Sequence, residues 1–292
     1  MMLLLKKILN KLLNVCFYLC LLAALWAGVQ VFCFTSFRIP TNSMEPALLP
    51  GDNIIVNKMA GGARLFDIFA ALNKEEFHIK RVPGTGSFER NDVLVFNFPY
   101  PNGWNNIRFD VMQYYVKRCI GLPGDTLEIR NGFFHINGVQ EALGNIEMQQ
   151  FIANLTDSTS KRTVMRSYPK DKQLGWTIQA FGPLYLPAKG QSVKMNRVNG
   201  VLYHRLIQWE QKKTVLLKEN GEVYLEDSLI TSYCFKQNYY FMAGDRLKDS
   251  QDSRYWGPLP EEFIVGRADY VWMSRKKKDR TVRWERFMKK IK

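Results

Sequence analysis

Two residues of this 292-residue chain have the side chains that a metal-free nucleophilic reaction needs: Ser43, which lies among prolines, and Lys117, at the end of an apolar segment. Other catalytic mechanisms lack the residues that they require. The chain has three histidines, no Gly-x-Ser-x-Gly sequence, no cysteine pair spaced for zinc and no phosphate-binding loop. If the chain is a hydrolase, we therefore expect a serine nucleophile that is activated by a lysine base, with no metal and no cofactor.

A lysine can act as this base only if its amine is neutral at the working pH. Because a free lysine titrates near 10.4, the pKa must fall by roughly two to three units, which costs about 3–4 kcal/mol. The apolar neighbours Tyr115, Val116 and Ile120 can supply that burial for Lys117. Lys80 lies in a similar local sequence but lacks the Gly-Leu-Pro-Gly-Asp continuation, and we expect it to be a solvated strand residue.

Composition limits the class of protein that presents these residues. Lysine and arginine number 41 against 27 acidic residues, which gives a net charge of +14, and 46% of the residues are hydrophobic. Such a composition predicts a folded protein rather than a disordered one. The mean hydropathy of −0.24 and the single long apolar run exclude a multi-span membrane protein. Three of the five cysteines (Cys16, Cys20 and Cys33) lie in that run, which excludes a disulfide scaffold.

The apolar run predicts an N-terminal transmembrane anchor. No charged residue occurs between Leu12 and Phe37, and about 20 apolar residues suffice to cross a bilayer. Lysines precede the run and none follows it closely, which predicts a cytoplasmic tail (1–11), an anchor (12–36) and an extracytoplasmic remainder. The alternative is a cleaved signal peptide. The run is long for one, and cleavage after Ala27 would place Leu25 where a small residue is needed, so we favour an uncleaved anchor.

The sequence predicts a mainly β structure for the rest of the chain. Apolar runs are short, and proline and glycine interrupt them often. The Asn-Gly pairs that begin at residues 131 and 220 lie between short alternating segments, and another at residue 137 follows closely; Asn-Gly favours tight hairpin turns. Between residues 40 and 275 long helical periods are absent, and we expect at most a short helix near 65–72.

Four segments in order, after a single span, closely resemble the bacterial type I signal peptidases, also called leader peptidases. They cover about residues 36–58, 88–98, 114–138 and 232–272. The resemblance implies an antiparallel β-sheet catalytic core (37–132 and 231–274) into which a second, β-rich cap domain (133–230) is inserted. The sequence offers no chemistry for that insert.

The resemblance also assigns roles to residues of this chain. Ser43 matches the nucleophile, Lys117 the general base, and Ser250 the hydroxyl that orients the lysine amine. Thr41 matches a side chain of the oxyanion hole. Two supporting ion pairs are implied, Arg118 with Asp245 and Asp252 with Arg254. The residues implied around the substrate are Ile39, Pro40, Met44, Leu48, Tyr115 and Val116.

One segment departs from the family pattern. The family usually has Gly-Asp-Asn-Arg-Asp-Asn-Ser, whereas this chain has Gly-Asp-Arg-Leu-Lys-Asp-Ser over residues 244–250. The length is kept, so Ser250 keeps its place, and we expect an altered local structure between Arg246 and Asp249. Cys119 replaces an aliphatic residue and is expected in the core. A disulfide between Cys119 and Cys234 is compatible with an extracellular location but is not required.

Residues 275–292 form a basic, amphipathic tail with ten basic and two acidic residues. Trp284, Phe287, Met288 and Ile291 recur at helical spacing. This pattern predicts a short helix, either on a membrane surface or packed on its own domain, and leaves both possibilities open. The charge points to anionic lipid, and we expect no nucleic-acid partner. The sequence does not determine the oligomeric state.

The resemblance implies a membrane-anchored serine endopeptidase that removes signal peptides from secreted preproteins after a small-x-small motif. Two alternatives belong to other classes. A self-cleaving Ser/Lys protease of the repressor type is disfavoured by the anchor and by the absence of a helix-turn-helix pattern before Ser43. A catalytically inactive, tethered binding protein is disfavoured by the presence of Ser43, Lys117 and Ser250.

Overall fold

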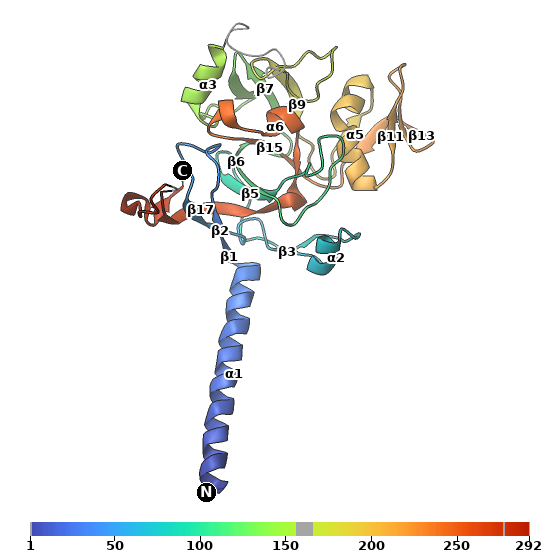
Figure 1. The fold of residues 1–292 in the computed structure, drawn as a ribbon. Helices are drawn as coiled ribbons and strands as arrows, with labels where there is room; N and C mark the ends of the chain where they lie inside the picture. Colours follow the sequence, from blue (N-terminus) through green and yellow to red (C-terminus); the bar gives the residue numbers. More distant parts are fainter. Residues whose placement is uncertain (1, 156–165, 277, 292) are drawn as a thin grey trace.

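The first element of the computed structural model, which describes residues 2–155, 166–276 and 278–291, is a helix that stands apart from the rest of the chain (Figure 1). This helix, α1, spans Met2–Phe32, and among the described residues it alone is long and apolar enough to cross a membrane. None of its apolar window is buried. The predicted helix is confirmed, but its predicted end at residue 36 is wrong. Strand β1 (Phe34–Arg38) begins two residues after α1, because these residues pair with β2.

The main sheet has eight strands, and all of its strand pairings are antiparallel. Its order is β1-β2-β17-β5-β6-β15-β16, and β18 pairs with β17. After β1, its strands are β2 (Asp52–Asn57), β5 (Val93–Asn97), β6 (Tyr114–Gly121), β15 (Tyr239–Ala243), β16 (Leu259–Pro260), β17 (Ile264–Ser274) and β18 (Lys289–Lys290). The predicted mainly antiparallel β class is therefore confirmed.

Smaller sheets surround the main one. Strand β7 lies between β8 and β9, β12 lies between β11 and β13, and β3–β4 and β10–β14 form two-stranded pairs. Their bounds are β3 (Arg64–Leu65), β4 (Lys80–Arg81), β7 (Thr126–Arg130), β8 (Phe133–Ile136), β9 (Phe181–Tyr185), β10 (Ser192–Lys194), β11 (Val215–Leu217), β12 (Val223–Leu225), β13 (Ser228–Ile230) and β14 (Ser232–Cys234). The predicted turn joins β7 to β8, with Asn131 and Gly132 at φ 48° and 84°, as a tight hairpin requires.

Helices occur where the sequence predicted mainly strands. Apart from α1, the helices are α2 (Ile68–Asn73), α3 (Ile146–Ala153), α5 (Arg197–Gln211) and α6 (Ser253–Trp256), with 3₁₀ turns η1 (Leu247–Asp249), η2 (Glu261–Phe263) and η3 (Trp284–Arg286). Only α2 lies near a predicted helix. The insert therefore combines strands β8 to β13 with the helices α3 and α5. Asn196 caps α5 through a 2.9 Å bond to the Asn199 amide, and Leu202 and Leu206, four residues apart, are buried.

Two hydrophobic clusters hold these elements together. One surrounds the segment that follows β1 and includes Ile39, Met44 and Leu48, with Val116 packed against it. The other runs from the main sheet into the insert and includes side chains from β6, β7, β9 and α5, so the insert shares its core with the catalytic sheet. Cys119 lies in this larger cluster, as expected, whereas Cys234 is exposed, and both are free thiols.

The C-terminal segment is not a helix, so both versions of the predicted amphipathic helix are wrong. Among its described residues, the chain makes the single turn η3 and then adds strand β18 to β17, with Lys290 opposite Tyr270. Arg286 explains the difference, because it is buried in an ion pair with Asp52 of β2. Trp284 and Phe287, which the helix would have placed on one face, remain 74% and 53% exposed.

Candidate active site

Ser43 lies in the segment between β1 and β2, residues 39–51, which is called the nucleophile loop below. Its prolines interrupt regular strand or helix. Two backbone hydrogen bonds hold the ends of this loop together. The Ile39 amide donates to the Asp52 carbonyl and the Gly51 amide donates to the Ile39 carbonyl, both at 2.8 Å. Gly51 adopts φ 96°, and a Cβ there would lie 1.9 Å from the Arg275 carbonyl oxygen. The loop therefore closes tightly and holds Ser43 against the sheet, 8% exposed.

Lys117 reaches Ser43 from strand β6. Its Nζ lies 2.6 Å from Ser43 Oγ, and its side chain is 3% exposed. Burial lowers the pKa of Lys117 to about 8, an effect that the Arg254 charge increases and the Asp252 and Asp245 charges oppose. The amine is therefore partly neutral near pH 8. By contrast, Lys80 is an exposed residue of β4, as expected.

The pair has the arrangement that nucleophilic catalysis needs, with the base in hydrogen-bond reach of the hydroxyl. The ring of Tyr115 lies 5.5 Å from Lys117 Nζ and stacks on Phe98, so it forms one wall around the amine. Among the described residues, no three His, Cys, Asp or Glu side chains gather as a possible metal site.

Ser250 lies next to the nucleophile loop. It ends η1 and is 6% exposed. Gly244 allows the close approach, because a Cβ there would lie 2.2 Å from Ser250 Oγ and 2.6 Å from the Ser43 carbonyl oxygen. Within the described part of the chain, Ser250 Oγ is buried and accepts or donates no hydrogen bond. Its predicted bond to the Lys117 amine is therefore not formed in this structure and stays a prediction. A buried hydroxyl without a hydrogen-bond partner is unfavourable, which is a reason to expect this bond.

The predicted substrate-binding residues occupy three environments. Ile39, Met44 and Leu48 are buried in the cluster under the nucleophile loop, and Val116 packs against the same cluster. Tyr115 packs against the larger cluster instead. Pro40 and Thr41 are exposed beside Ser43. The contacts of this side of the loop with substrate, and the role of Thr41 in an oxyanion hole, stay predictions.

Both predicted ion pairs are present around Ser43 and Lys117. Arg118, which follows the lysine on β6, binds Asp245 through two bonds of 2.6 and 2.7 Å. Arg254 binds Asp252 through bonds of 2.9 and 3.0 Å, and both side chains are almost fully buried. Asp252 also accepts the Gly244 amide at 3.0 Å. Because bidentate pairs have a defined geometry, the Arg118–Asp245 pair fixes the segment that carries Ser250 against β6, and the Arg254–Asp252 pair stabilises that segment internally.

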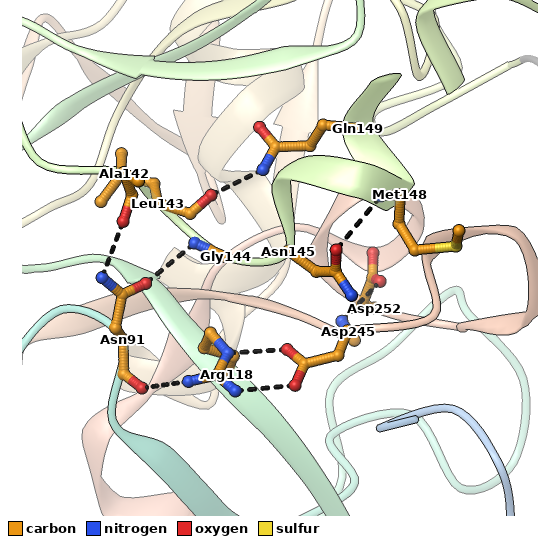
Figure 2. A network of polar contacts seen from close by, with 11 residues as sticks. Asn91, Arg118, Ala142, Leu143, Gly144, Asn145, Met148, Gln149, Asp245 and Asp252 are labelled. Carbon is orange, nitrogen blue, oxygen red and sulfur yellow. Dashed lines mark hydrogen bonds and ion pairs between the residues drawn. The ribbon is translucent and has the colours of Figure 1, made fainter. Parts of the chain in front are cut away.

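Sequence reasoning missed the continuation of this network. Figure 2 shows that Arg118 also donates to the Asn91 backbone carbonyl, at 2.7 Å. The Asn91 side chain in turn donates to the Ala142 carbonyl at 2.9 Å and accepts the Gly144 amide at 2.8 Å. The insert is thus connected, through Asn91, to Arg118, the residue that follows Lys117 on β6. No sequence signal marks Asn91 beyond its place in the segment 88–98.

A second group of residues that the sequence did not reveal lies under the nucleophile loop. Arg286 donates to both carboxylate oxygens of Asp52, at 3.0 and 2.5 Å, and to the Ala47 carbonyl at 2.8 Å. Arg283 donates to the Pro50 carbonyl at 3.1 Å. The C-terminal arginines therefore hold the second half of the loop in place, a role hidden by their position in a basic tail.

Comparisons with known proteins find matches over most of the chain. The family described as "Signal peptidase, peptidase S26" matches residues 9–273. Signal peptidase I of Buchnera aphidicola (subsp. Schizaphis graminum) is 29% identical over 86% of this chain and 72% of its own length. The Pseudomonas aeruginosa enzyme is 28% identical over 84% and 67%, and the Aquifex aeolicus enzyme 26% over 89% and 82%.

Among solved structures, a signal peptidase I from Enterococcus faecalis is 22% identical, and the match covers 62% of this chain and 95% of that chain with a TM-score of 0.28. The family match spans both ion pairs, Ser43, Lys117 and Ser250 in one continuous region. The chain therefore belongs to the signal peptidase family, peptidase S26.

Proposed function

We propose that this protein is a membrane-anchored serine endopeptidase that removes N-terminal signal peptides from exported preproteins, with Ser43 as nucleophile and Lys117 as general base. One observation carries the proposal: Lys117 Nζ lies 2.6 Å from Ser43 Oγ, and its lowered pKa makes the neutral amine available near pH 8. Membership of the signal peptidase family supports the same reaction. No observation favours a self-cleaving protease or an inactive tethered protein.

The chemistry follows from the two side chains. Neutral Lys117 takes the hydroxyl proton of Ser43 while the oxygen attacks the scissile carbonyl, and the Ser43 amide with the Thr41 hydroxyl stabilises the negative oxygen. The Lys117 ammonium then gives its proton to the leaving amine, which breaks the peptide bond and leaves an acyl ester on Ser43. Water, deprotonated by the same lysine, hydrolyses the ester and restores the dyad.

The test compares the purified full-length protein with its Ser43→Ala variant on a preprotein substrate. We expect the wild type to release mature protein and the variant to release none above background. Ser228→Ala is the matched control. Ser228 is an exposed residue of β13, far from Ser43 in the sequence, and the variant should cleave the substrate like the wild type. Equal cleavage by Ser43→Ala and wild type would refute the proposal.

The anchor gives the proposed location. Helix α1 has a mean hydropathy of 2.1 in its apolar window, and Lys6, Lys7 and Lys11 lie in its first part. We place the N-terminus in the cytoplasm, α1 in contact with membrane lipid and the catalytic domain outside. A reporter that is active only in the cytoplasm should be silent when fused to the C-terminus, and an active fusion would contradict this orientation.

A further inference from the structure

Arg246 belongs to the segment that departs from the family pattern, and it touches the nucleophile directly. Its backbone amide donates to the Ser43 carbonyl at 3.0 Å. The two segments are in close contact at this point, since a Cβ on Gly244 would lie 2.6 Å from the same carbonyl oxygen and 2.2 Å from Ser250 Oγ. A displacement of residues 244–250, called the Ser250 loop below, therefore displaces Ser43 as well.

The Arg246 side chain adds a second connection between the two loops. Its Nη1 is ion-paired with the Glu45 carboxylate, two residues after Ser43. Its Nε is 2.8 Å from Asp249, the residue before Ser250. A guanidinium can hold two carboxylates at once because its donors point in fixed, divergent directions, which an ammonium cannot reproduce. One side chain thus joins the flanks of Ser43 and Ser250.

The exposure of this link indicates what it contributes. The side chains of Arg246, Glu45 and Asp249 are 28%, 30% and 44% exposed, and ion pairs this open contribute little to global stability. The other end of the nucleophile loop is held separately, by Arg286 on Asp52 and on the Ala47 carbonyl. The Arg246 link is therefore placed to fix the local position of the loop around Ser43 rather than the fold.

We propose that Arg246 is a positioning residue for the reaction: by joining Glu45 to Asp249 it holds Ser43 at the distance from Lys117 that proton transfer requires. This inference rests on the proposed function. It assigns a purpose to the altered segment, because Arg246 and Asp249, which stand where the family usually has asparagine, are two of the three residues that form the link.

The first test is a double-mutant cycle on the full-length protein. Arg246→Gln and Glu45→Gln should each lower kcat by about tenfold to a hundredfold, because small misplacements of a reacting group have effects of this size. KM and Tm should stay near the wild-type values. The double variant should be no slower than either single one, because both singles break the same link. Arg197→Gln is the matched control: Arg197 is 33% exposed, close to Arg246, and the substitution breaks its 2.8 Å pair with Asp171 in the insert, so kcat should not change.

The second test is a charge exchange in an Asp249→Asn background, which removes a carboxylate that would repel a new glutamate. In this background, Glu45→Arg and Arg246→Glu should each be slow, and the two together should regain most of the lost kcat. This recovery shows that the pair between positions 45 and 246 carries the effect, and an unchanged Tm throughout the series excludes a merely structural contribution. The pH midpoint of kcat should not move, since the charges acting on Lys117 are those of Asp252, Asp245 and Arg254.

The outcomes separate the inference from the proposed function. If Ser43→Ala is inactive while Arg246→Gln turns over like the wild type, the inference is wrong and the function stands. If Arg246→Gln loses kcat only together with a lower Tm, the link is structural and the inference is again wrong. If the charge exchange recovers nothing, the pair between positions 45 and 246 does not carry the effect, and the inference is wrong as well. If Ser43→Ala cleaves normally, the proposed function itself is wrong.

Discussion

Lys117 Nζ and Ser43 Oγ lie 2.6 Å apart, although 74 positions separate the two residues in the chain. A strand and a loop bring them together: Lys117 projects from β6, and the nucleophile loop closes over it between β1 and β2. Neither β6 nor the nucleophile loop alone would make the Lys117 amine or the Ser43 hydroxyl reactive. Burial of the amine beside the hydroxyl creates the base, because it lowers the cost of the neutral form relative to the charged one.

The first prediction concerns pH. Since the pKa of Lys117 is lowered to about 8, the amine is protonated below that pH and neutral above it. The value of kcat/KM should therefore rise about tenfold per pH unit well below pH 8 and level off above it. Lys117→Arg should be inactive at every pH, because a guanidinium stays charged. A pH–rate profile on one preprotein checks both statements, and turnover by Lys117→Arg would exclude Lys117 as the base.

Ser250 supplies the second prediction. Its buried hydroxyl has no partner among the described residues, so Ser250→Ala removes no bond from the resting fold and should leave Tm unchanged. If the hydroxyl orients the Lys117 amine during the reaction, kcat should fall about tenfold, the size expected for one hydrogen bond of about 1.4 kcal/mol.

Ser253→Ala is the contrasting variant. Ser253 is fully buried and its Oγ accepts the Met242 amide at 2.9 Å. Its loss should lower Tm, because it leaves a buried amide unpaired, at a cost of about 1–3 kcal/mol. If Ser250→Ala keeps the wild-type kcat, Ser250 does not orient the lysine.

The parts of the site that could be predicted from sequence are those with local signals. Ser43, Lys117, Ser250 and both ion pairs lie within motifs whose order and spacing are themselves the signal, and the structure brings these side chains close together. The Asn131-Gly132 turn was predictable for a similar reason, because its positive φ angles suit those two residue types.

The C-terminal segment could not be predicted, because a partner distant in sequence decides its conformation. The apolar residues recur at helical spacing, but burying Arg286 against Asp52 and pairing β18 with β17 outweigh that local preference. Helix α5 was missed for a different reason. Gly200 interrupts its pattern, and this glycine is there because a Cβ would lie 2.7 Å from Val223 Cγ2.

The third prediction tests this C-terminal contact. Arg286→Met leaves the Asp52 carboxylate, which is fully buried, with only the Leu49 amide, at 2.8 Å, as a side-chain partner among the residues that the structure describes. Breaking one side of such a pair costs about 3–5 kcal/mol, so Tm should fall by several degrees. The double variant Asp52→Asn with Arg286→Met should regain much of the loss, because no charge is then buried alone. Thermal unfolding with and without the second substitution measures this, and an unchanged Tm for Arg286→Met would show that the pair is not needed.

The fourth prediction is substrate choice. Strand β1 is at the edge of the main sheet, so its outer side offers unpaired backbone groups to which an extended peptide can add as another strand. Alternate side chains of that peptide, P1 and P3, then face the same wall. We place Ile39, Met44, Leu48 and Val116 in this wall, and their close packing leaves room only for small groups.

A preprotein series with Ala, Gly, Ser, Leu or Phe at P1 tests this wall. Small residues should be cleaved, whereas Leu and Phe should reduce kcat/KM by at least tenfold to a hundredfold, because forcing a larger group into a packed site costs about 1–3 kcal/mol or more. The same substitutions at P2 are the control, since that side chain points away from the wall and should matter little. Proline just after the cut should also resist, because it lacks the amide hydrogen and stiffens the chain. If bulky P1 residues were cleaved as fast as alanine, the assignment of the wall would be wrong, and with it the preference for a small-x-small motif.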